Sequence, residues 1–117
     1  MYEKFGQFIN GKWQASSGNE TYDVYNPATE ELIGKASKAN SKDVQLAIKS
    51  AEKGLEIWKN TSPWERSKII RKISELIKKK SDTLSKWLTL EVGKPISESP
   101  GEVSGAADIF EWNSEET

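Results

Sequence analysis

The sequence predicts an α+β fold in which a small set of short antiparallel strands, residues 7–36, precedes about four helices in residues 40–117. Asn10-Gly11 lies between two short apolar runs and indicates a two-residue hairpin, because both residues readily adopt positive φ. Farther along the chain, apolar residues recur at the three- and four-residue spacing of helices. No repeat or linker divides residues 1–117, so we expect one domain.

The strand region continues after the first hairpin with two more strand candidates. Residues 21–25 and 32–36 are separated by Asn26-Pro27-Ala28-Thr29. This segment is a turn pattern, because proline presets φ and the asparagine side chain can bond the backbone two residues on. We therefore expect a second antiparallel pair.

The first two predicted helices begin at polar caps. Asn40 or Ser41 caps the first, and Ser62-Pro63-Trp64-Glu65 opens the second with a serine–proline–x–glutamate pattern that satisfies free amides. The lysines at 78–80 suit the negative end of the second helix. The predicted inward faces are Val44, Ala47, Ile48, Ala51, Leu55 and Trp58 in the first helix, and Ile69, Ile70, Ile73, Leu76 and Ile77 in the second.

The last two predicted helices are separated by Gly93-Lys94-Pro95. Ser81 is expected to cap the third helix, and Gly93 suits the left-handed position that ends it. Ser99-Pro100-Gly101-Glu102 is again a start pattern, with Ser99 as the expected cap. The apolar stripes expected to form core or interface are Leu84, Trp87, Leu88 and Val92, then Val103, Ala106, Ala107 and Phe110.

Composition excludes several classes of function. The chain has 117 residues, a net charge of -1 and neither cysteine nor histidine. This removes disulfides, thiol nucleophiles, imidazole bases and nearly every zinc site, and we expect no bound metal. The charge balance favours neither nucleic acid nor an anionic membrane. Without a membrane-length apolar run or a signal-peptide pattern, we expect a cytoplasmic protein.

Few residues are candidates for chemistry. Gly93-Lys94-Pro95 lacks the glycine-rich run of a phosphate loop and is interpreted as a helix stop with a solvated lysine. Glu98 and Glu102, one helical turn apart, form a possible acid/base pair but are favoured as surface residues. Gly101 and Gly105 share one helix face, which indicates either a closely packed helix or room for a small ligand.

Taken together, these landmarks resemble the N-terminal segment of the aldehyde dehydrogenase superfamily, most nearly its succinate-semialdehyde dehydrogenase-like branch. The resemblance extends from about Phe8 to Glu116 and covers almost the whole chain. The matching pieces are Phe8-Ile9-Asn10-Gly11-Lys12-Trp13, Tyr25-Asn26-Pro27-Ala28-Thr29-Glu30-Glu31, Asp43-Val44, Trp58, Glu65-Arg66, Leu90-Glu91-Val92-Gly93-Lys94-Pro95, Gly101-Glu102-Val103 and Phe110-Glu111-Trp112.

Three positions depart from the family pattern. Glu30 stands where the family usually has glycine, Ser99-Pro100 interrupts what is usually an uninterrupted helix, and Asn113 replaces an aromatic residue. We expect these departures to affect local geometry and the shape of a pocket.

The resemblance implies a role in NAD(P)-dependent oxidation of an aldehyde, such as succinate semialdehyde, to a carboxylate. In that family a cysteine thiolate attacks the aldehyde, hydride passes to the nicotinamide, and a glutamate activates water to hydrolyse the thioester. The family's catalytic and cofactor-binding residues all lie downstream of the matched region. We therefore expect no catalytic residue and no cofactor-binding residue in this chain.

Residues 1–117 are accordingly expected to be part of a larger NAD(P)-binding domain, inactive alone and binding neither NAD nor NADP. The expected partner is the remainder of the dehydrogenase chain, in an enzyme that forms a homo-oligomer. By the resemblance, Gly101 and Gly105 would border the substrate entrance tunnel. The alternative is a stand-alone helical module that binds a protein partner through exposed tryptophans.

Overall fold

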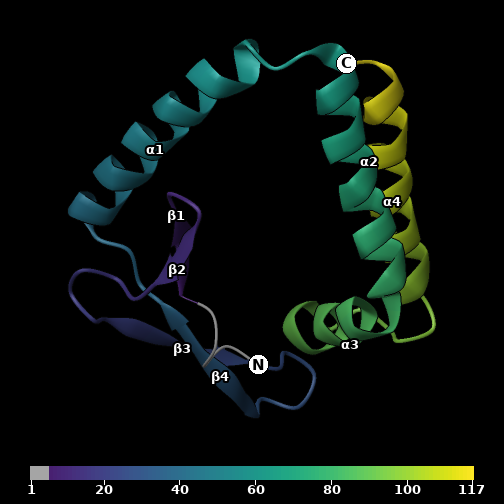
Figure 1. Ribbon diagram of the computed structural model, residues 1–117. Helices are drawn as coiled ribbons and strands as arrows, with labels where there is room; N and C mark the ends of the chain where they lie inside the picture. Colours follow the sequence, from purple (N-terminus) through teal and green to yellow (C-terminus); the bar gives the residue numbers. More distant parts are fainter. Residues whose placement is uncertain (1–5) are drawn as a thin grey trace. The chain divides into compact units, whose positions relative to one another are not determined.

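The computed structural model describes residues 6–117, which divide into two compact units, one ending at Lys59 and one from Asn60 to Thr117. The first unit contains two strand pairs and one helix, and the second contains three helices (Figure 1). In chain order the elements are β1 (Gln7–Ile9), β2 (Lys12–Gln14), β3 (Thr21–Tyr25), β4 (Leu32–Ser37), α1 (Ser41–Lys59), α2 (Pro63–Lys79), α3 (Ser81–Val92) and α4 (Ser99–Glu115).

The first hairpin forms as the Asn-Gly pattern predicts. β1 and β2 pair antiparallel with Phe8 opposite Trp13, and the rings of these two residues lie 5.1 Å apart between centroids. Asn10 and Gly11 have φ values of 55° and 75°, the two positive values that a type I′ turn requires. The hairpin prediction is confirmed.

β3 and β4 form a second, separate antiparallel pair. The Asn26 side-chain oxygen accepts a hydrogen bond from the Ala28 amide at 2.9 Å, which closes the predicted turn. Glu30 ends this turn with φ 59°, in the left-handed region. The glutamate that replaces the family's usual glycine therefore occupies a conformation that glycine adopts at lower cost.

The N-termini of α1 and α2 carry reciprocal caps. In α1 the Asn40 side chain accepts from the Asp43 amide at 3.2 Å, and the Asp43 carboxylate accepts from the Asn40 amide at 3.0 Å. In α2 Ser62 and Glu65 form the same kind of box, as predicted. The choice left open for α1 is thus resolved in favour of Asn40.

Two predicted serine caps are wrong. α3 begins at Ser81 as a helical residue after Lys80, with no side-chain cap. α4 is preceded by Glu98, and the Ser99 hydroxyl instead bonds the Thr89 hydroxyl at 2.8 Å and donates to the Pro95 carbonyl at 3.3 Å. Ser99 is fully buried because it joins two helices, so its hydroxyl is not available to the free amides of its own helix.

The end of α3 agrees with the prediction. Gly93 adopts φ 76° in the left-handed region and its amide bonds the Thr89 carbonyl at 3.0 Å. Pro100 lies in the first turn of α4, where its missing amide hydrogen costs no helical hydrogen bond. The helix therefore begins at Ser99-Pro100, as the start pattern predicts.

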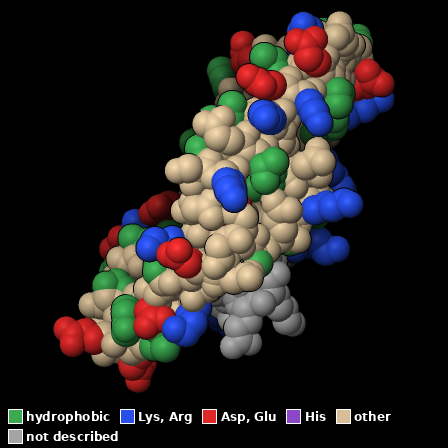
Figure 2. All heavy atoms as spheres, turned by 90° about the vertical axis from the view of Figure 1, so that its left-hand side faces the viewer, with side chains coloured by type: hydrophobic (Ala, Val, Ile, Leu, Met, Phe, Trp, Pro, Cys, Tyr) green, Lys and Arg blue, Asp and Glu red, His purple; other side chains and the backbone are tan. Residues whose placement is uncertain are grey.

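The predicted apolar stripes are mostly exposed in the described part of the chain. On α1, only Asp43 is buried, and on α2 only Ser74 is buried. On α4, Val103 and Ala107 are buried as predicted, whereas Ala106 and Phe110 are exposed. The exposed members of the predicted stripes include Val44, Ile48, Leu55, Trp58, Ile69, Ile73, Leu76 and Val92. On the face drawn in Figure 2, apolar side chains lie among charged ones at the surface.

Candidate functional site

The glycine pair of α4 faces open space. Gly101 and Gly105 are exposed, and a methyl group added at either would meet no heavy atom within 4 Å. The buried positions of α4, among them Val103 and Ala107, lie on the other side of the helix. No helix of the described chain packs against the glycines, so the surface that they form is open to a ligand or to a further element.

Lys94 connects the loop after α3 to the start of α4. Its ammonium lies 2.9 Å from a Glu102 carboxylate oxygen and 3.7 Å from Glu98. The hydrogen bond to Glu102, followed by its charge, raises the pKa of Lys94 above the ordinary value. This lysine is less solvated than the sequence indicated, and the two glutamates are its ion-pair partners. A carboxylate pair held by one cation is not arranged as a separate acid and base.

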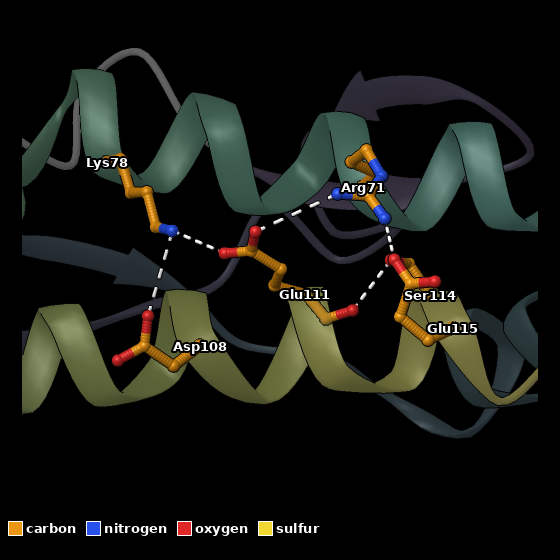
Figure 3. A network of polar contacts seen from close by, with 6 residues as sticks. All are labelled: Arg71, Lys78, Asp108, Glu111, Ser114 and Glu115. Atoms are coloured by element: carbon orange, nitrogen blue, oxygen red, sulfur yellow. Dashed lines mark hydrogen bonds and ion pairs between the residues drawn. The ribbon is translucent and has the colours of Figure 1, made fainter.

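A polar network runs along the contact between α2 and α4 (Figure 3). Lys78 bonds Glu111 at 2.5 Å and lies 3.7 Å from Asp108. Arg71 pairs with Glu111 and with Glu115. The hydrogen bond from Lys78 lowers the pKa of Glu111, and the same bond raises the pKa of Lys78. Lys78 is thus an interhelical contact as well as a helix-end cation.

A hollow of about 450 Å³ lies beside this contact, where the end of α2 meets α3 and α4. We call it the α3–α4 hollow. Two carboxylates, Glu91 and Glu102, stand at its wall. Its apolar lining is Ile77, Leu84, Trp87, Leu88, Val103 and Ala106. The lining includes three of the four residues of the predicted apolar stripe of α3. This face of α3 is therefore only partly buried.

In the first unit, the structure shows that Asp43 accepts several hydrogen bonds, a role that the sequence analysis did not predict. Only 2% of it is exposed, and its carboxylate accepts hydrogen bonds from the amides of Ser17 and Asn40, each at 3.0 Å, and from the Gln7 side chain at 3.5 Å. The bond from Asn40, followed by those from Ser17 and Gln7, holds the pKa of Asp43 below its ordinary value. The Asn-x-x-Asp spacing could have indicated the local half of this arrangement.

Each of the four described helices carries an acidic residue in its first turn. Asp43, Glu65 and Glu102 each put a carboxylate in the first turn of a helix, where a bound phosphate would need positive potential. Within residues 6–117, no cluster of three or more acidic, histidine or cysteine side chains is arranged to hold a metal ion. None of the described helices is both long and apolar enough to span a bilayer.

Comparison with known proteins assigns the chain to a family. Residues 13–117 match the model of the aldehyde dehydrogenase family, and the chain belongs to that family. A glutarate-semialdehyde dehydrogenase of Pseudomonas putida is 38% identical over 109 residues, which are 93% of this chain and 23% of that protein. The NADP+-dependent succinate-semialdehyde dehydrogenase of Escherichia coli is 37% identical over 92% of this chain and 22% of its own length.

The fold agrees with this assignment. A succinate-semialdehyde dehydrogenase of Burkholderia pseudomallei superposes with a TM-score of 0.92 at 36% identity, over 96% of this chain and 23% of that structure. The elements seen here are those of the N-terminal part of the aldehyde dehydrogenase fold. The chain spans about a quarter of the length of the relatives that it matches.

Proposed function

We propose that this chain forms the N-terminal part of an NAD(P)-dependent aldehyde dehydrogenase and is inactive without the remainder of that enzyme. The carrying observation is the family match over residues 13–117. The absence of cysteine from the sequence supports the second half of the proposal, since the thiolate chemistry implied by the family needs that side chain. The chain would contribute structure, and the nucleophile and nicotinamide site would come from the remainder.

The relatives suggest which substrates and cofactors to test. Succinate and glutarate semialdehydes are the first choices, because they appear in the names of the similar dehydrogenases. Both NAD+ and NADP+ belong in the assay, since a fission yeast relative is named for NADP+ and a similar Staphylococcus aureus structure holds NAD+. The assembled enzyme is proposed to be a homo-oligomer. The exposed Gly101–Gly105 face is the proposed tunnel border.

A chimera tests this function. Residues 13–117 would replace the matching segment of the Escherichia coli succinate-semialdehyde dehydrogenase, with the E. coli enzyme as the positive control. We expect aldehyde-dependent formation of NADPH by the chimera and none by the isolated chain. A soluble, folded chimera without activity would contradict the proposal, as would turnover by the isolated chain.

The stand-alone interaction module is the competing function. Trp64 and Trp112 are 80% and 70% exposed, which is the surface that such a module would use. The chimera distinguishes the two functions. A protein-binding module unrelated to the enzyme would not restore turnover when it replaces the dehydrogenase segment, so an inactive chimera would favour the interaction module.

A further inference from the structure

We infer that Asn10-Gly11 is a site of chemical modification, at which the asparagine side chain loses ammonia and becomes aspartate or isoaspartate. Both residues are exposed at the turn between β1 and β2, with φ values of 55° and 75°. The reactants are these two residues and water. The modification therefore does not depend on the dehydrogenase function.

The reaction has two steps. In the first, the Gly11 backbone nitrogen gives its proton to a base and attacks the side-chain carbonyl carbon of Asn10. A new C–N bond closes a five-membered imide, and the bond to the side-chain nitrogen breaks as that nitrogen takes up a proton and leaves as ammonia. In the second step, one water opens the imide. Opening at the side-chain carbonyl gives aspartate, and opening at the main-chain carbonyl gives isoaspartate.

Gly11 leaves the attacking nitrogen accessible. It has no side chain, and a Cβ built at this position would meet no heavy atom within 4 Å. The strand register pairs Ile9 with Lys12, so Gly11 lies outside the ladder between β1 and β2. Asn10-Gly11 is also the only Asn-Gly pair in the sequence. Every other asparagine is followed by a residue whose side chain crowds its nitrogen or, in proline, by a nitrogen without a proton.

The Asn10 side chain is unrestrained, in contrast to other asparagines of the chain. The side-chain amides of Asn26 and Asn113 bond backbone groups at 2.9 Å and 2.8 Å. The Asn10 side chain makes no hydrogen bond to any of residues 6–117. Its carbonyl carbon is therefore free to turn toward the following nitrogen.

One hydrogen bond opposes ring closure. Closure brings the Asn10 side chain and the next peptide nitrogen together, so its rate depends on how readily the turn opens. β1 and β2 have three residues each and form a two-stranded sheet of their own, an arrangement of marginal stability. The Asn10 amide donates to the Ser50 hydroxyl at 3.0 Å and so ties the turn to α1. Ser50 is thus the restraint on the reaction.

The two products differ in their effect on the hairpin. Asp-Gly suits the same turn as Asn-Gly. The new carboxylate would lie at a hollow of about 390 Å³ whose lining includes Asn10, Lys49 and Lys53. Isoaspartate adds one carbon to the main chain inside a two-residue turn, which breaks the register that places Phe8 opposite Trp13.

Site-resolved mass spectrometry of the purified chain tests the inference. The chain is kept at neutral pH and digested under acidic conditions, and replacement of the side-chain amino group by hydroxyl is measured at each asparagine. Asn19 is the internal control, because it is exposed and has φ 53° but precedes Glu20. We expect Asn10 to react at least about tenfold faster than Asn19 and to give both products. Equal rates at the two positions would overturn the inference.

Gly11→Ala tests the attacking nitrogen. The added methyl group should slow the reaction at Asn10 by at least about tenfold. Alanine is strained at φ 75°, and an opened hairpin would only speed ring closure, so slowing must come from the methyl group itself. An undiminished rate would overturn the assignment of this nucleophile.

Ser50→Ala tests the restraint. Loss of the hydroxyl should speed the reaction at Asn10 by about two- to tenfold, the range expected from one hydrogen bond. Ser41→Ala is the matched control, at an exposed position of the same helix. Equal rates in the two variants would overturn the role given to Ser50.

Discussion

The two units hold their helices in different ways. In residues 6–59, α1 is attached through individual hydrogen bonds near its N-terminal half. The Asp43 carboxylate binds the Ser17 amide, and the Ser50 hydroxyl accepts from the Asn10 amide at 3.0 Å. In residues 60–117, α4 is buried along one face, from Ser99 to Ser114.

The two units also differ in the size of the side chains that they bury. The residues buried in α2 and α4 include Ser74, Ala107 and Ser114, whose small side chains allow close helix packing. Many of the large apolar side chains are exposed in both units. The second unit thus buries one face of α4, whereas hydrogen bonds at Asp43 and Ser50 join α1 to the strand region of the first unit.

The largest expected effect tests the close packing in the second unit. Ala107 is 0% exposed, so Ala107→Leu should force α4 away from its neighbours and cost about 1–3 kcal/mol of unfolding free energy in urea titrations. Ala106→Leu is the matched control one residue away, where the exposed site should tolerate the change. Equal destabilisation by the two variants would contradict close packing of α4 at Ala107.

The next test breaks the polar attachment of α1. Asp43→Asn removes the carboxylate that accepts from both Ser17 and Asn40, so the Ser17 amide should exchange with solvent roughly tenfold faster. Exchange is read by NMR, with Glu52→Gln on the exposed part of α1 as the control. Unchanged protection at Ser17 would show that the loop is held by other contacts.

Acid provides a reversible version of the same test. The folded pKa of Asp43 lies below its ordinary value of 3.8, so its contribution to stability is complete above that value. The contribution is lost as the pH falls through the lowered folded pKa. The Ser17 amide resonance, followed from about pH 6 to about pH 2.5, should report the loss. Asp43→Asn should remove this step, and a step that persists in the variant would assign it to another carboxylate.

The smallest expected effect is a gain in the first unit. Glu30 has φ 59°, so Glu30→Gly should relieve backbone strain and stabilise the β3–β4 turn by about 1 kcal/mol or less. Glu31→Gly, at the neighbouring position outside the left-handed set, should instead destabilise the turn. Thermal melting of the two variants, compared with the unsubstituted chain, shows whether each substitution raises or lowers the melting temperature.

Local hydrogen bonding is the part of this structure that the sequence predicts well. The Asn10-Gly11 hairpin, the Ser62–Glu65 capping box and the Gly93 helix end all depend on groups within a few residues of one another. The ordered motifs likewise identified the family, because they extend over nearly the whole chain.

Burial could not be predicted in the same way. Helical spacing identifies an apolar face on α1 and α2, but it does not specify which body covers that face. The predicted positions Leu55 and Ile69 are 61% and 49% exposed in this chain.

By itself, then, the sequence determined the helices, the strands, most of their ends and the family. Only the tertiary structure decided that Ser99 joins α3 to α4, that Asp43 gathers the amides of distant residues, and that Gly101 and Gly105 face open space. The physical reason is range. Caps and turns depend on neighbours along the chain, whereas the burial of a helix face depends on the surface that packs against that face.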